Sequence, residues 1–78
     1  MNIIYSKQAE KALMRLDVPT RQRIGQGIHK LPDGDIKRLK GYTTLYRLRI
    51  GNWRILFTMI ANNITIEDVL PRGDAYKK

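Results

Sequence analysis

The chain has 78 residues, with 15 lysines and arginines against 7 acidic residues, so its formal net charge is +8. A chain of this length can bury only one small core, so we expect a single domain spanning residues 1–78. It contains no cysteine, which excludes disulfides and thiolate metal sites.

The N-terminal segment lacks the basic start and the long apolar run of a signal peptide. No apolar stretch approaches the roughly 18 residues of a membrane-spanning helix. We therefore expect a soluble, cytoplasmic protein with no membrane partner. The excess of positive charge indicates a polyanionic partner, which is either nucleic acid or an acidic protein.

The first third of the chain predicts a strand and two helices. Residues 2–6 favour a short strand, and Ser6 is suited to cap the helix that follows. In that helix the apolar residues recur at helical spacing and form one stripe: Ala9, Ala12, Leu13 and Leu16. Pro19 is placed to start a second helix, whose stripe is Ile24, Gly27, Ile28 and Leu31. Glycine weakens a helix, and close packing against a neighbouring element would explain Gly27.

The second half predicts a sheet. Asp33 and Asp35 lie in a dense turn after the helices and are interpreted as turn formers. The basic segment 36–44 leaves room for a short extended piece. Three predicted strands follow, at residues 45–50, 53–61 and 64–70, connected by Gly51-Asn52 and Asn62-Asn63. The predicted order is β-α-α-β-β-β, an α+β fold with two helices packed on one face of an antiparallel sheet.

The hairpin sequence YRLRIGNWRILF, residues 46–57, alternates between apolar and polar side chains. A two-residue Gly51-Asn52 loop would pair Arg49 with Arg54 and place Arg47 on the same face. Like charges directly opposite each other destabilise a strand pair by up to about 1 kcal/mol, so fold stability does not explain them. From residue 36 to residue 66 there is no acidic residue, and the basic residues are Lys37, Arg38, Lys40, Arg47, Arg49 and Arg54. This face therefore predicts an open groove for a polyanion.

The opposite face of the hairpin predicts the core. Tyr46 and Trp53 belong to it because their alternation matches the neighbouring apolar residues. Regular pairing of the last strand would place Asp68 on this apolar face, so we expect either a frayed edge or a register shift of one residue there. His29, the only histidine, is interpreted as a surface residue at the edge of the second helix.

With these segments in order, the chain resembles the RelE-type toxins of type II toxin–antitoxin modules. The resemblance runs from about residue 2 to the C-terminus, and its most specific segments are LKG, LYRLRIGNWRILF and PRGDAY. It implies an endoribonuclease that cuts mRNA in the ribosomal A site by attack of a 2′-OH on the adjacent phosphate. The products would be a 2′,3′-cyclic phosphate and a 5′-OH, formed without metal or cofactor.

The resemblance also implies partners and site residues. The partners would be a cognate antitoxin, the ribosome with its mRNA, and operator DNA bound only through the antitoxin complex. Carried over by motif, the catalytic residues are Arg47, Arg49, Arg54, Arg72 and Tyr76. We expect the basic connection to contribute RNA-binding residues, which are Lys37, Arg38 and Lys40.

One departure from the family pattern concerns the general base. Arg47 and Arg49 stand where the pattern has lysines, and a lysine with a lowered pKa can accept the 2′-OH proton. Arginine stays protonated in proteins, so the base is left open between Tyr76, Lys40, the ribosome, and catalysis by positioning and electrostatics alone. Two other functions stay open: a ParE-like inhibitor of DNA gyrase and a non-catalytic RNA- or ribosome-binding module.

Overall fold

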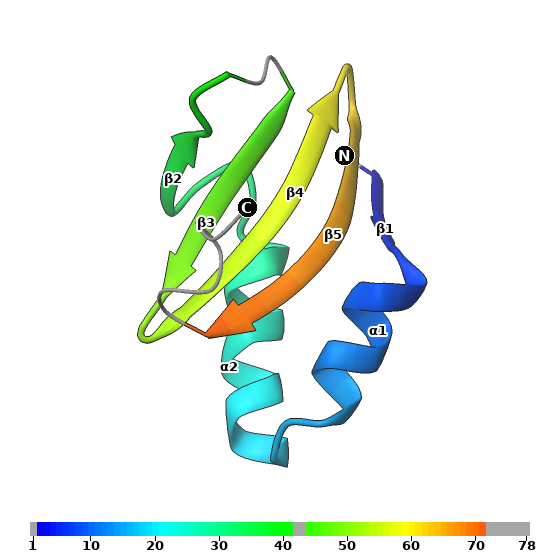
Figure 1. Cartoon of the computed structure of the whole chain (residues 1–78), viewed down its shortest axis with the longest axis vertical. Coiled ribbons are helices and arrows are strands. Elements are labelled where there is room, and N and C mark those ends of the chain that lie inside the picture. Colours follow the sequence, from blue (N-terminus) through cyan, green and yellow to red (C-terminus); the bar gives the residue numbers. More distant parts are fainter. Residues whose placement is uncertain (1, 42–43, 72–78) are drawn as a thin grey trace.

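The computed structural model describes residues 2–41 and 44–71. Its elements are β1 (Asn2–Tyr5), α1 (Lys7–Met14), α2 (Val18–His29), β2 (Asp35–Arg38), β3 (Leu45–Ile50), β4 (Trp53–Ile60) and β5 (Asn63–Pro71). The strands form one curved sheet in the order β1-β5-β4-β3-β2, and both helices pack on the same face of it (Figure 1). The predicted α+β fold is confirmed.

Two features of the sheet differ from the expectation. The sheet is mixed, because β1 pairs with β5 in parallel whereas the other strand pairs are antiparallel. The basic connection contains an additional edge strand, β2, which pairs with β3. Alternation of side chains shows that a short strand can form, but it does not say which sheet edge a four-residue strand joins.

Among the described residues, no helix is long and apolar enough to cross a membrane.

Both helices begin at a side-chain cap. The Ser6 hydroxyl accepts a hydrogen bond from the Ala9 N–H at 3.0 Å and donates one to the Glu67 carbonyl at 2.8 Å, which ties α1 to β5. The Asp17 carboxylate accepts from the Thr20 hydroxyl at 2.7 Å and from the Thr20 N–H at 3.2 Å. The hydrogen bond from the Thr20 hydroxyl is the larger cause, and that from the Thr20 N–H the smaller, of a pKa of Asp17 that lies below its ordinary value.

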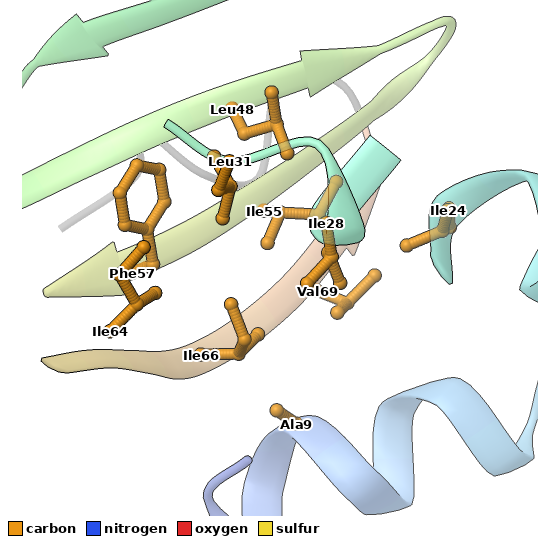
Figure 2. Packing of buried hydrophobic residues seen from close by; sticks show 10 residues of the cluster. All are labelled: Ala9, Ile24, Ile28, Leu31, Leu48, Ile55, Phe57, Ile64, Ile66 and Val69. Atoms are coloured by element: carbon orange, nitrogen blue, oxygen red, sulfur yellow. The ribbon is translucent and has the colours of Figure 1, made fainter. Parts of the chain in front are cut away.

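The core lies between the helices and the sheet, as Figure 2 shows. Its buried residues come from α1, α2, the turn after α2 and three strands: Ala9, Ile24, Ile28, Leu31, Leu48, Ile55, Phe57, Ile64, Ile66 and Val69. Tyr46 stacks on Phe57 with ring centroids 5.5 Å apart, and Trp53 packs half-buried against the same cluster. The core assignment of both aromatic residues is therefore confirmed. His29 lies exposed at the end of α2, as predicted.

A β-bulge in β5 resolves the position of Asp68. Leu56 pairs with Asp68 whereas Phe57 pairs with Ile66, so Glu67 is an extra residue in β5. The shift places Val69 in the core and Asp68 on the other face, and the predicted register shift is confirmed. The Asp68 carboxylate then accepts hydrogen bonds from the Gln8 side-chain amide and from the Val69 N–H.

The β4–β5 turn lies one residue earlier than predicted. Asn63 pairs with Ile60 inside the sheet, so the two connecting residues are Ala61 and Asn62 rather than Asn62 and Asn63. Ala61 adopts a φ of 54°, a conformation that alanine rarely takes. Asn63 is also paired on its other side, because it lies opposite Asn2 of β1 and its side chain accepts a hydrogen bond from the Asn2 side-chain amide at 3.2 Å.

We predict opposite consequences for two glycines of α2. A Cβ at Gly27 would overlap Ile50 Cδ1 and lie 3.1 Å from Ile50 Cγ1, whereas a Cβ at Gly25 would meet nothing within 4 Å. Gly25→Ala should raise the free energy of unfolding by about 1 kcal/mol. Gly27→Ala should raise the free energy of unfolding by less than this or lower it, because the Ile50 side chain must move. Urea denaturation measures both, and equal gains would contradict this close approach of α2 to β3.

A second prediction concerns the cap of α2. Because the pKa of Asp17 is lowered in the folded state, its stabilisation is complete above the unfolded-state pKa and is lost as the pH falls through the folded-state pKa. Asp17→Ala should lower the Tm at pH 7, and the deficit should shrink below about pH 4. Ser6→Ala, which removes the uncharged cap of α1, is the control whose deficit should persist. A deficit of Asp17→Ala that is independent of pH would contradict this account.

Candidate nucleic-acid interface

The face of the sheet opposite the helices carries two cross-strand rows, each made of three charged residues and one leucine. One row runs Asp35–Arg49–Arg54–Leu70 across β2, β3, β4 and β5, and the next runs Lys37–Arg47–Leu56–Asp68. The predicted pairing of Arg49 with Arg54 is confirmed, as is the common face of the three hairpin arginines. A second like-charge pair, Lys37 opposite Arg47, adds to the same face. We call Arg47, Arg49 and Arg54 with their neighbours on this side the arginine face.

The arginine face is not as open as predicted. Arg47 and Arg54 are only 8% and 6% exposed, whereas the Arg49 side chain is 56% exposed. Their direct cross-strand neighbours on this face include Leu56 and Leu70, and Leu56 is buried too. A long arginine stem packs well along such apolar side chains. The alternation of side chains along a strand predicts which face of the sheet a residue occupies, but it does not predict how far the side chain is buried there.

The two buried arginines keep unused donors. Arg54 Nη1 donates to the Trp53 carbonyl at 3.3 Å, and Arg47 Nη1 donates to the Asp35 carbonyl at 3.3 Å. The Nε atoms of both side chains are buried and lack a hydrogen-bond partner among the described residues. Unpaired buried donors of a charged group are costly. Guanidiniums bind phosphate oxygens with strong, often bidentate hydrogen bonds. The two Nε atoms are covered by the chain, so an anion from outside would meet the exposed Arg49 side chain first.

Asp35 contacts the hairpin arginines, which the sequence pattern did not predict. The expectation that Asp35 forms a turn is wrong, because Asp35 is the first residue of β2 and its carboxylate contacts two arginines of β3. Its Oδ1 lies 3.4 Å from Arg47 Nη1, and its Oδ2 lies 3.6 Å from Arg49 Nε. The signal that could have found it is an extension of the hairpin pattern: a third strand running antiparallel to 45–50 puts Asp35 opposite Arg49.

The predicted RNA-binding residues do not share one face. Lys37, Arg38 and Lys40 are all exposed. Lys37 lies opposite Arg47 and belongs to the arginine face, whereas Arg38 lies opposite Tyr46, whose side chain packs on the core side. The structure therefore brings Lys37 to the hairpin arginines and places Arg38 on the other face of β2.

Two of the predicted catalytic residues, Arg72 and Tyr76, lie outside the described residues, as does Tyr42 of the basic connection. Their assignment stays a prediction. The last described residue, Pro71, pairs with Trp53, so β5 ends beside the residue that precedes Arg54.

A cleft elsewhere on the surface has a different lining. It measures about 650 Å³ and lies between α1 and the end of β5, where Lys7, Lys11 and Arg15 line it on one side and Trp53 and Pro71 on the other. None of the three hairpin arginines lines it. Among the described residues, no group of three or more histidine and acidic side chains is placed to hold a metal ion.

The chain resembles a RelE toxin in sequence, and in fold it resembles structures of RelE–RelB complexes. The chain is 31% identical to Toxin RelE3 of Methanocaldococcus jannaschii over 84 aligned positions, which cover 97% of this chain and 96% of the relative. Its structure is similar to that of the RelB–RelE antitoxin–toxin complex of Methanococcus jannaschii, with a TM-score of 0.78, 30% identity and 94% of each chain covered. The archaeal RelE–RelB complex of Pyrococcus horikoshii OT3 gives a TM-score of 0.78 at 26% identity, covering 94% of this chain and 96% of that one. No family model matches the chain.

The burial of Arg54 leads to a stability prediction. A buried guanidinium with an unpaired Nε is often less favourable than an apolar side chain of similar length. Arg54→Met should therefore raise the free energy of unfolding by about 1 kcal/mol or more, measured by urea denaturation. Lys11→Met removes one exposed positive charge from α1 and should change stability by less than about 0.5 kcal/mol. A destabilised Arg54→Met variant would mean that the arginine supports the fold.

Proposed function

Because the chain belongs to the RelE family of toxins, we propose that it is the toxin of a type II toxin–antitoxin module and cleaves ribosome-bound mRNA. The observation that carries the proposal is the set of three guanidiniums on one sheet face, with two like-charge pairs set directly across strands. The fold gains nothing from these pairs, and two of the guanidiniums are buried with an unpaired Nε. An RNA phosphate would offset the positive charge of the arginine face.

In the proposed reaction, the arginine face holds the scissile phosphate. Attack of the 2′-OH builds negative charge on the non-bridging phosphate oxygens, and guanidiniums placed in advance stabilise this charge. Arg49 is the exposed arginine and makes the first contact with the phosphate. Arg47 and Arg54 are more deeply buried beside it and add positive charge to the same face. Arg72 remains a candidate for the same phosphate, and Tyr76 for stacking on an unpaired base. No step of this scheme calls for a metal or cofactor.

The proposed partners follow from the charge and from the relatives. Two similar archaeal RelE proteins are seen in complexes with RelB. We infer that a cognate antitoxin binds this chain as well, and that acidic side chains of the antitoxin offset part of its net charge of +8. The complex would bind operator DNA through the antitoxin. Action on translating ribosomes places the protein in the cytoplasm.

A second candidate is a non-catalytic RNA- or ribosome-binding module. The observation in its favour is the composition of the arginine face, where Arg47 and Arg49 replace lysines and cannot accept a proton. ParE-like inhibition of DNA gyrase is a third outcome, which the experiment below distinguishes.

The test is cleavage in a purified translation system. Programmed ribosomes with the wild-type chain should yield mRNA cut in the A-site codon, with a 5′-OH on the downstream fragment. The double variant Arg54→Ala/Arg72→Ala should lose at least about 100-fold in cleavage rate, because transition-state donors of this kind contribute about that much each. The matched control Lys11→Ala/Arg15→Ala removes the same charge from the helical layer and should still cleave.

Three outcomes would contradict the proposal. Intact mRNA with arrested translation would favour the binding module, and intact mRNA with inhibited DNA supercoiling would favour gyrase as the target. Full cleavage by the double variant, with folding verified by circular dichroism, would show that these arginines are not the site.

A further inference from the structure

We propose that Asp35 is the general base of the cleavage reaction, an inference that rests on the proposed function. The reaction needs a group that accepts the 2′-OH proton, and the three hairpin arginines cannot do so. A carboxylate is suited to this task, because it is an acceptor when ionised and can carry a proton afterwards. The described residues place three carboxylates toward this side of the sheet: Asp35, Glu67 and Asp68.

Two of these carboxylates are poorly placed for the task. The Asp68 carboxylate accepts hydrogen bonds from the Gln8 side chain and the Val69 N–H, with one oxygen used by each donor. Glu67 accepts from the Thr58 hydroxyl at 3.2 Å and lies on β5, which β4 separates from Arg47 and Arg49 on β3. Neither carboxylate contacts a hairpin arginine through a described ion pair.

Asp35 is placed differently. Its two oxygens lie 3.4 Å from Arg47 Nη1 and 3.6 Å from Arg49 Nε, and its side chain is 58% exposed. These separations are long for charge-assisted hydrogen bonds, which are typically about 2.7–2.9 Å, so the carboxylate is only loosely held. A phosphate bound by the same two guanidiniums would bring its neighbouring ribose to the Asp35 side chain. A 2′-OH attacking that phosphate lies within hydrogen-bond reach of a base so placed, directly or through one water.

The proton and electron balance is simple. Asp35 takes the proton of the 2′-OH while an electron pair of the 2′ oxygen forms the new bond to phosphorus. The bond from phosphorus to the 5′ oxygen breaks, and its electron pair leaves with that oxygen, which takes a proton from water. Asp35 then releases its proton to solvent. Arg47 and Arg49 keep their protons throughout and stabilise the charge on the phosphate oxygens.

The experiment compares Asp35→Asn with wild type in single-turnover cleavage on programmed ribosomes. Asparagine keeps the size and an acceptor oxygen toward the arginines, but it cannot accept the proton. The rate of the chemical step should fall about 10²- to 10⁴-fold, the usual contribution of a general base. Affinity for programmed ribosomes should stay equal or rise, because a negative charge beside the phosphate site is removed. Asp33→Asn, an exposed turn acid two residues away, is the matched control and should cleave like wild type.

Chemical rescue separates a base from a structural contact. Asp35→Ala should regain cleavage in proportion to added formate, which can enter the vacated space and accept the proton. Two results would overturn the assignment: an unchanged cleavage rate in Asp35→Asn, and a loss in Asp35→Asn that is confined to ribosome affinity. A wild-type chain that does not cleave at all would instead overturn the proposed function, and the base assignment with it.

Discussion

The register of the β3–β4 hairpin is the constraint on which the rest of the structure depends. Ile50 opposite Trp53 fixes every later pair, so apolar residues of both strands meet the helices while arginines gather on the other face. A slip of β3 by one residue would turn Arg47 and Arg49 into the core and expose Leu48 to water. The core of a 78-residue chain is too small to tolerate that exchange. The same register that stabilises the domain therefore forces Arg49 against Arg54.

The neighbouring strands adjust to this hairpin in two ways. The bulge at Glu67 lets β5 keep Ile66 and Val69 in the core and takes Asp68 out of it, where its carboxylate accepts a hydrogen bond from the Gln8 side chain. On the other edge, β2 brings the carboxylate of Asp35 to Arg47 and Arg49, which offsets part of their repulsion. Each adjustment lies next to the arginine face. Among the residues that the structure describes, the ion pairs of this positively charged face all involve the exposed carboxylate of Asp35.

The sequence was sufficient wherever local pattern decides the structure. Alternation and the Gly51-Asn52 loop predicted β3, the β4 register and the common face of the arginines, and helical spacing predicted the stripes of both helices. It failed where distant pairings decide: the parallel partner of β1, the edge strand β2 and the turn at Ala61. The contacts of Asp35 with Arg47 and Arg49 could not be predicted for the same reason, because they form only when β2 lies beside β3. How deeply the Arg47 and Arg54 side chains are buried depends on packing across the strands, and the alternation of the sequence does not predict that packing.

The measurement that most directly tests the account is cleavage of an mRNA with a single 2′-deoxynucleotide on the 5′ side of the mapped cut. If the arginine face promotes attack by the adjacent 2′-OH, the all-ribose mRNA is cut on programmed ribosomes, and the deoxy-substituted mRNA stays intact at that position. Equal cleavage of both would contradict the account, because the nucleophile would then come from elsewhere. Absence of cleavage in both would contradict it as well, and would leave the arginine face as a binding surface.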